Sequence, residues 1–167
     1  MATTKLKGNP VALAGSMPAV GDAVPDFKLV KSDLSAITHK DIAGKTTILL
    51  TVPSLDTPVC QIETRKFNEK AATLPNVTVL IASPDLPFAI KRFCAAEGID
   101  KVHGVSDIRD RGFGKRWGVE ITEGPFEGIM ARAAFVIDPN NRIKYVELVP
   151  EIAEEPNYDA IIAAAAG

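Results

Sequence analysis

The most constraining feature of the sequence is a strand, a loop, a helix and a second strand in direct succession. Residues Thr46 to Val52 form an apolar, β-branched run, and Val77 to Ala82 form another. Continuous apolar runs of this length are typical of strands that are covered on both faces. Between them, Gln61 to Ala72 has the spacing of an amphipathic helix. The succession predicts a βαβ unit with two parallel strands and a right-handed crossover.

Two helices of the chain have predictable inner faces. On the first helix, the side chains that we expect to face the core are Ile62, Phe67 and Ala71. A second helix is predicted from Phe88 to Glu97, because Pro87 suits a first helical turn and Gly98 suits a helix end. Its larger or softer apolar positions are Phe88, Ile90, Phe93 and Cys94.

The remaining elements complete one α/β domain. An N-terminal β-hairpin is predicted from Thr3 to Lys7 and from Val11 to Ala14, with its turn at Gly8-Asn9-Pro10. The later elements are a strand at 102–105, a short helix at 113–117, strands at 133–138 and 142–149, and a helix at 156–165. This order fits a thioredoxin-like α/β fold with a central mixed sheet and flanking helices. No linker or repeat divides the chain, so we expect a single domain over residues 1–167.

Composition narrows the class of protein. A chain of 167 residues buries roughly 70% of its unfolded surface, so it folds without disulfide staples. Its net charge of -2, with 24% charged residues, offers no basic excess for nucleic acid or acidic lipid. No apolar stretch approaches a transmembrane length, and the run from Val11 to Ala14 is too short for a secretory signal. We therefore expect a cytoplasmic protein. Two cysteines are too few for a disulfide scaffold, so we also expect no stable structural disulfide.

Cys60 is the strongest candidate for chemistry. It stands at the start of the first predicted helix, where unpaired N–H groups and the helix macrodipole favour a thiolate over a thiol. A free cysteine is often only a small buried hydrophobic residue. That alternative does not account for the preceding Thr57 or for the prolines Pro53 and Pro58. We therefore expect Cys60 to be reactive.

For the other candidates, the residues alone allow both a structural and a functional interpretation. Cys94 lies in an apolar helical stretch beside Phe93, so burial explains it as well as function does. Arg132 precedes a predicted strand, where an arginine is more often a solvated edge residue than a catalytic cation. The histidines, His39 and His103, form no close metal-ligand pair with each other or with the cysteines, so we expect no metal site.

The loop before Cys60 resembles the active-site loop of the peroxiredoxins. Pro53, Thr57 and Cys60 form the pattern P-x-x-x-T-x-x-C. Further segments narrow the resemblance to the bacterial thiol peroxidases: V-P-S-L-D-T-P-V-C, R-K-F-N-E, D-L-P-F-A, K-R-F-C, A-E-G-I and L-V-P-E-I. The similarity extends from about Thr3 to Ala165.

The resemblance assigns a role to each candidate. It implies that Cys60 attacks the peroxide, Thr57 orients it, Pro53 shields the thiolate from water, and Arg132 lies beside the sulfur. It also implies that Cys94 is the resolving cysteine, which condenses with a Cys60 sulfenic acid to form an intramolecular disulfide. Hydrogen peroxide and alkyl hydroperoxides are the implied substrates. The implied enzyme needs no metal, haem or flavin, is reduced again by thioredoxin, and forms a homodimer near the active-site loops.

Two further expectations concern the surroundings of the cysteines. Pro53, Leu55 and Phe88 are expected to line an apolar pocket for organic peroxides. Because a disulfide needs Cα atoms within about 7 Å, we expect the first turn after Cys60 and the helix around Cys94 to unwind on oxidation.

Two other classes of protein remain possible. A general thiol-disulfide oxidoreductase would use the same fold, but positions 57 and 63 are Thr and Glu, so Cys60 has no partner cysteine close in sequence. A redox sensor or binding protein would carry the same cysteines and turn over slowly.

Overall fold

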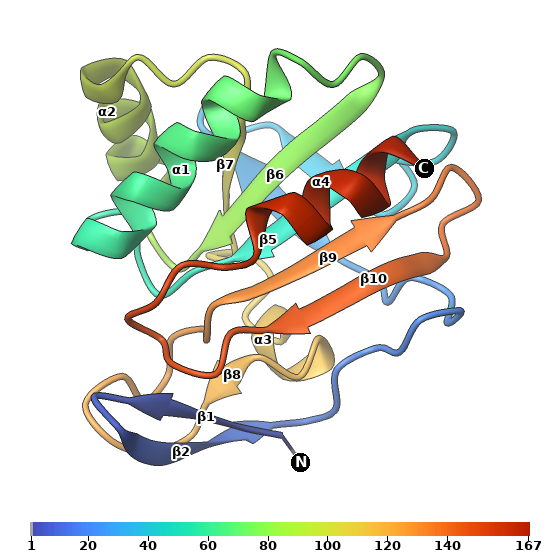
Figure 1. Cartoon of the computed structure of the whole chain (residues 1–167). Coiled ribbons are helices and arrows are strands. Elements are labelled where there is room, and N and C mark those ends of the chain that lie inside the picture. The colour runs from blue at the N-terminus through green and yellow to red at the C-terminus, as the bar shows by residue number, and fades with distance from the viewer. Residues whose placement is uncertain (1) are drawn as a thin grey trace.

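The computed structural model describes residues 2–167, which build a seven-stranded mixed sheet with helices on both faces (Figure 1). In chain order the strands of this sheet are β3 (Lys28–Lys31), β4 (Ala36–Thr38), β5 (Thr46–Thr51), β6 (Val77–Ser83), β7 (His103–Ser106), β9 (Ala133–Ile137) and β10 (Ile143–Leu148). Their order across the sheet is β10-β9-β5-β6-β7-β3-β4. The helices are α1 (Pro58–Ala71), α2 (Pro87–Glu97), α3 (Phe113–Arg116) and α4 (Tyr158–Ala166).

The predicted βαβ unit is confirmed. Strand β5 pairs in parallel with β6, and α1 connects them. Strand β6 in turn pairs in parallel with β7 through α2, while the other neighbouring strands are antiparallel. The sheet is therefore mixed, as the sequence predicts, and the carboxyl ends of β5 and β6 lie at the same edge.

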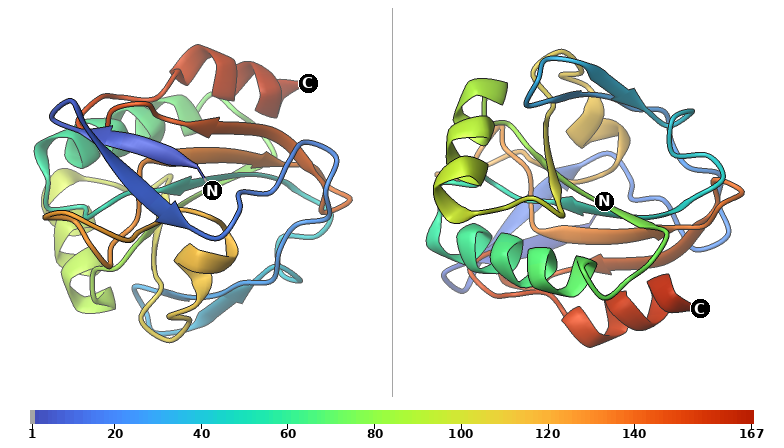
Figure 2. Two further views of the ribbon diagram at one scale, coloured as in Figure 1. Left: turned by 90° about the horizontal axis from the view of Figure 1, so that it is seen from below. Right: turned by 90° about the horizontal axis from the view of Figure 1, so that it is seen from above.

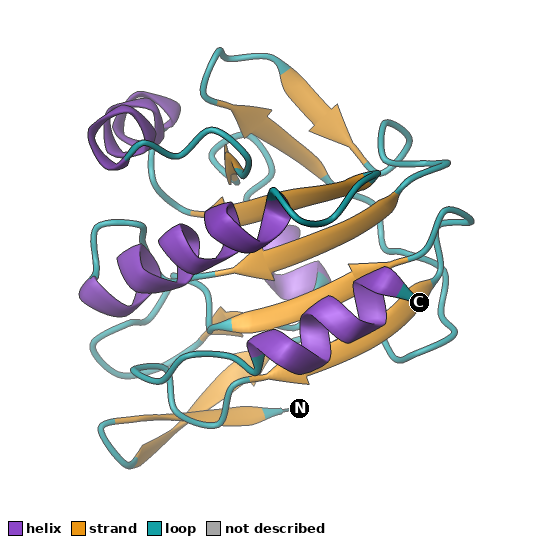
Figure 3. Ribbon diagram, turned by 45° about the horizontal axis from the view of Figure 1, so that its top comes forward, coloured by secondary structure: helices purple, strands orange, loops and turns teal. Residues whose placement is uncertain are grey.

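Helices cover both faces of the central sheet (Figure 2). Alternating side chains of the central strands divide the core into two layers. Ile48 and Leu50 of β5 pack with apolar residues of α1, α2 and α4, whereas Leu49 packs on the other face with residues of α3. Figure 3 shows α1 and α4 lying along the same face of the sheet. Because successive strand residues point to opposite faces, a strand that is buried on both sides must be apolar throughout.

The N-terminal hairpin is confirmed, but its turn starts one residue earlier than predicted and is one residue shorter. Strands β1 (Thr3–Leu6) and β2 (Asn9–Ala14) are joined by Lys7 and Gly8, which have φ angles of 51° and 82°. Two left-handed residues suit the twist of a two-residue hairpin. Pro10 lies within β2, and the short β8 (Glu120–Ile121) pairs with the end of β2 to form a second, three-stranded sheet that the sequence does not predict.

The helix faces differ from the prediction at two positions. Helix α1 begins at Pro58, three residues before the expected start, and it buries Cys60, Glu63, Thr64 and Phe67. Phe67 was expected there, but Ile62 is 36% exposed. In α2, Ile90 is buried as expected, whereas Phe88 is 68% exposed.

Candidate active site

Cys60 lies in the first turn of α1, directly after the loop of residues 53–57, which we call the cysteine loop. Thr57 is the N-cap residue and Pro58 is the first helical residue, so Cys60 is the third residue of the helix. The N–H groups of a first helical turn have no partner within the helix and stabilise nearby negative charge. The predicted position of Cys60 at a helix start is confirmed, and its side chain is completely buried.

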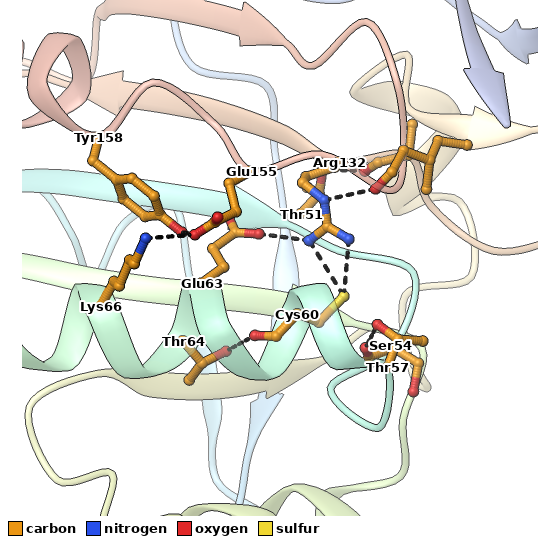
Figure 4. Close-up of polar contacts among 12 residues, drawn as sticks. Thr51, Ser54, Thr57, Cys60, Glu63, Thr64, Lys66, Arg132, Glu155 and Tyr158 are labelled. Atoms are coloured by element: carbon orange, nitrogen blue, oxygen red, sulfur yellow. Dashed lines mark hydrogen bonds and ion pairs between the residues drawn. The ribbon is translucent and has the colours of Figure 1, made fainter. Parts of the chain in front are cut away.

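Arg132, the residue just before β9, reaches the Cys60 sulfur (Figure 4). Its Nη1 and Nη2 atoms each lie 3.3 Å from Cys60 Sγ, and its Nε donates to the Ile152 carbonyl oxygen at 2.9 Å. The position follows from strand pairing, because Arg132 immediately precedes β9, where Ala133 lies opposite Thr51 at the end of β5. Arg132 is only 2% exposed, so the interpretation as a solvated edge residue is wrong.

Glu63 is a buried member of the same cluster that the sequence analysis missed. Its Oε2 atom accepts a hydrogen bond from Arg132 Nη1 at 2.6 Å, and its side chain has no exposed surface. Its other oxygen, Oε1, has no hydrogen-bond partner among residues 2–167. The available signal was its position three residues after Cys60, which places both side chains on one face of the helix.

The Arg132 guanidinium therefore donates hydrogen bonds to two acidic groups at once, the Cys60 sulfur and the Glu63 carboxylate. Burial raises the pKa of Glu63 to about 7, and the adjacent Arg132 offsets only part of this effect. Burial also opposes the charge on Arg132, but Glu63 and Cys60 outweigh it and hold the pKa of Arg132 above its ordinary value. Arg132 is thus a cation that stays charged beside the sulfur.

Thr57 and Pro53 lie in the cysteine loop, as the sequence predicts, but neither forms a hydrogen bond with the sulfur. The Thr57 hydroxyl donates to the Ser54 carbonyl oxygen at 3.0 Å, and the Thr57 N–H donates to the same oxygen at 3.3 Å. Pro53 is buried just beyond the end of β5. The structure therefore brings Arg132 to the sulfur and holds Thr57 in the loop beside it (Figure 4).

Cys94 is a partly buried thiol on α2, and both cysteines are free. Burial raises the pKa of Cys94, and a hydrogen bond with the Gly104 backbone opposes this shift. Cys94 belongs to the same apolar core cluster as Cys60, although the two lie on different helices. In this conformation Cys94 favours the neutral thiol.

The expected apolar pocket is only partly present. A surface groove of ≈ 540 Å³ runs between the cysteine loop and α2, and Leu55, Phe88 and Phe93 are among the residues that line it. Pro53 and Cys60 are not among its lining residues. The expectation that Pro53 shares a pocket with Leu55 and Phe88 is therefore wrong.

Two kinds of feature are absent from residues 2–167. No three His, Cys, Asp or Glu side chains are grouped closely enough to hold a metal ion in this part of the chain. No helix within the same residues has the length and apolar character that a bilayer crossing requires.

Comparison with known proteins places the chain among thiol-dependent enzymes. The Redoxin family model matches residues 19–162. A thiol peroxidase of Leptospira interrogans is 54% identical over 167 residues, which cover 99% of this chain and 98% of that protein. A thiol peroxidase of Mycobacterium tuberculosis is 48% identical over 164 residues, covering 98% of each. The chain belongs to the thiol peroxidase family.

The fold agrees with this membership. The crystal structure of a peroxiredoxin-like protein from Aquifex aeolicus superposes with a TM-score of 0.93 at 46% identity, covering 99% of this chain and 96% of that one. Membership in the thiol peroxidase family makes this chain a peroxiredoxin-type oxidoreductase that reduces peroxides. It also confirms the predicted thioredoxin-like fold.

Proposed function

We propose that this chain reduces hydroperoxides through a sulfenic acid on Cys60, which Cys94 then resolves as an intramolecular disulfide. The observation that carries this proposal is the pair of 3.3 Å contacts from Arg132 to the Cys60 sulfur. The guanidinium places two hydrogen-bond donors on one sulfur at the start of a helix, where negative charge that develops around the sulfur during the reaction is stabilised.

The first step transfers one oxygen atom to sulfur. The Cys60 thiolate attacks the terminal oxygen of ROOH in line with the O–O bond, that bond breaks, and RO⁻ leaves and takes up a proton to become ROH. Sulfur is oxidised to the sulfenic acid and the peroxide is reduced. Cys60 has no exposed surface, so the peroxide enters during a local fluctuation of the cysteine loop.

Stabilisation of the transition state contributes more to the rate of peroxide reduction than formation of the thiolate does. During attack, negative charge moves from sulfur onto the two peroxide oxygens, so fixed donors aimed at them lower the barrier. Arg132 and the first-turn N–H groups of Val59 and Cys60 supply such donors. The Thr57 hydroxyl joins them when it turns away from the Ser54 carbonyl oxygen.

The second step closes a disulfide. The Cys94 thiol condenses with the Cys60 sulfenic acid, so that an S–S bond forms and water leaves. The new bond closes a loop that restrains the chain by roughly 3 to 4 kcal/mol on the entropy model. Because the cysteines lie on different helices, the first turn after Cys60 in α1 and the part of α2 around Cys94 unwind to let the sulfurs meet.

We also propose a reductant, an oligomeric state and a cellular compartment for this chain. A thioredoxin dithiol reduces the disulfide and becomes oxidised itself, which returns two free thiols. The chain forms a homodimer near the cysteine loop, where Leu86 and Phe88 are exposed apolar side chains. It works in the cytoplasm, where the reducing environment keeps Cys60 and Cys94 free.

One experiment tests this mechanism. Peroxide consumption is followed with thioredoxin, its reductase and NADPH for the wild type, Cys60→Ser and Cys94→Ser. We expect Cys60→Ser to lose all reaction with peroxide. In Cys94→Ser a trapped sulfenic acid should accumulate and thioredoxin-linked cycling should be impaired. Slow turnover in the wild type would instead support a redox sensor, and disulfide exchange without peroxide reduction would support a general oxidoreductase.

Arg132→Lys adds a more specific arm to the same experiment. Lysine keeps the charge, but one ammonium group cannot span the sulfur and a peroxide oxygen as a planar guanidinium can. We expect the rate of Cys60 oxidation to fall about a hundredfold, as for the loss of one oxyanion donor. Arg116→Lys, a surface arginine paired with Asp110, is the matched control and should keep the wild-type rate.

A further inference from the structure

Asp85 joins the cysteine loop to the segment that leads into α2. One carboxylate oxygen accepts a hydrogen bond from the Ser54 hydroxyl at 2.7 Å. The other accepts from the Leu55 N–H at 2.7 Å and from the Ser83 hydroxyl at 2.8 Å. Ser83 is the buried last residue of β6, so the carboxylate has a fixed anchor. Asp85 thus ties two adjacent loop residues to the end of a central strand.

Ser54 passes this constraint on to the start of α1. Its carbonyl oxygen accepts both the hydroxyl and the N–H of Thr57, and its hydroxyl oxygen accepts the Asp56 N–H at 3.1 Å. Thr57 is the N-cap residue of α1, three positions before Cys60. A displacement of Ser54 therefore displaces the N–H groups that surround the sulfur.

On its other side, Asp85 lies two residues before Pro87, the first residue of α2. The N-cap residue of this helix is Leu86, which supplies no side-chain cap, and only Pro87 and Ile90 are buried within the helix. An element with few buried apolar contacts opens at low cost. The attachment of the helix start therefore depends strongly on the residues just before it.

Gly104 of β7 provides a second link between the loop and α2. A Cβ atom at this position would lie 2.5 Å from Ile90 Cγ2, 3.6 Å from Leu55 Cδ1 and 3.8 Å from Cys94 Sγ. The loop side chain Leu55 and the α2 side chains Ile90 and Cys94 thus converge over one glycine. Movement of α2 away from β7 removes packing from Leu55, whose N–H is held by Asp85.

We propose that Asp85 is a positioning residue that couples the two chemical steps at Cys60 and Cys94. While its three hydrogen bonds hold, the cysteine loop and α2 keep the arrangement that reacts with peroxide. When they break, α2 is released and the disulfide forms. Asp85 therefore speeds sulfenic acid formation at Cys60 and slows the condensation with Cys94 that expels water. This inference rests on the mechanism proposed above.

A single-turnover experiment separates the two steps. Reduced protein is mixed with hydrogen peroxide without reductant, quenched at successive times, and its thiol, sulfenic acid and disulfide forms are counted by intact-mass spectrometry. For Asp85→Ala we expect sulfenic acid formation to slow about tenfold and disulfide formation to accelerate about tenfold. A factor of this size corresponds to the free energy of about one hydrogen bond. A variant that is merely less well folded slows both steps together.

Two milder variants keep the test decisive if Asp85→Ala does not fold. Asp85→Asn retains an oxygen for the Leu55 N–H and places an amide against Ser54, so it should rescue most of both rates. Ser54→Ala removes one of the three hydrogen bonds. It should slow sulfenic acid formation and accelerate disulfide formation, each by a smaller factor than Asp85→Ala. Wild-type rates in Ser54→Ala would contradict the proposal.

Glu97→Gln is the matched control for α2. Glu97 is bonded to Arg65 Nη1 at 3.0 Å, which attaches the end of α2 to α1 without contacting the cysteine loop. This variant should leave the peroxide step unchanged. The proposal is overturned if Asp85→Ala alters neither rate, slows both, or accelerates the peroxide step. Failure of the underlying mechanism looks different, because the wild type itself would then yield no sulfenic acid or no disulfide.

Discussion

At the scale of single residues, the reactive sulfur shares one cation with a buried carboxylate. Arg132 contacts both Cys60 and Glu63, and none of the three side chains is more than 2% exposed. A buried ion pair contributes little net stability but is costly to break, because the remaining charge is left without a partner. The cluster therefore fixes the guanidinium against the sulfur. It also leaves Glu63 as a buried carboxyl group whose charge depends on pH.

This arrangement predicts how stability depends on pH. Because the pKa of Glu63 is about 7 in the folded protein against an ordinary value of 4.5, the folded state holds a proton that the unfolded chain releases between these values. The stability from this group is fully present below about pH 4.5 and is lost as pH rises through about 7. We expect Glu63→Gln to flatten the pH dependence of the unfolding free energy in that window, as measured by urea denaturation.

An exposed glutamate on the same helix supplies the control. Glu69→Gln removes one carboxylate from the outer face of α1, so its pH dependence should follow the wild type. If Glu63→Gln also keeps the wild-type slope, Glu63 does not titrate in this range and its burial has no effect on proton binding.

The residue scale also shows where sequence reasoning succeeds. Cys60 can be predicted as the candidate for chemistry because its loop has a specific pattern. Arg132 can be predicted as the candidate cation because it matches the family segment before a strand. Glu63 could not be predicted from its residue type, since charged side chains on helices normally face water. Its burial depends on Arg132, which lies 69 positions away in the sequence.

At the scale of elements, the ends of α2 could be predicted more fully than the face it buries, whereas the start of α1 was expected three residues too late. Pro87 and Gly98 mark the limits of α2 in both the sequence and the structure. The exposure of Phe88 could not be predicted, because an apolar side chain in a first helical turn faces the core or the solvent according to how the helix docks on the sheet. Tertiary docking thus decides what local propensity leaves open.

Oxidation should change the protection of two helices only. If the disulfide between Cys60 and Cys94 requires local unwinding, amide hydrogens in the first turn of α1 and around Cys94 in α2 exchange faster in the oxidised protein. Hydrogen-exchange mass spectrometry on reduced and oxidised samples measures this directly. Helix α4, which carries no cysteine, is the internal control and should be equally protected in both states. Equal protection of α1 and α2 as well would contradict the proposed conformational change.

At the scale of the whole molecule, the parallel centre of the large sheet follows from the sequence and the smaller sheet does not. The buried runs of β5 and β6 are continuous and apolar, so their parallel pairing could be predicted. Strand β8 contains only two residues, and its pairing with β2 joins segments far apart in the sequence. No local pattern marks so short a strand.

The surface of the molecule predicts where a homodimer would form. Leu86 and Phe88 are 51% and 68% exposed at the start of α2, beside the cysteine loop. Burying an aromatic side chain in an interface contributes about 1.5 to 3 kcal/mol, which corresponds to at least a tenfold change in the dissociation constant. We expect Phe88→Asp to weaken dimerisation at least this much, as measured by sedimentation velocity over a range of concentrations. Val20 is 65% exposed elsewhere on the chain, so Val20→Asp is a control of matched exposure that should sediment like the wild type. An unchanged dimer in Phe88→Asp would place the interface on another surface.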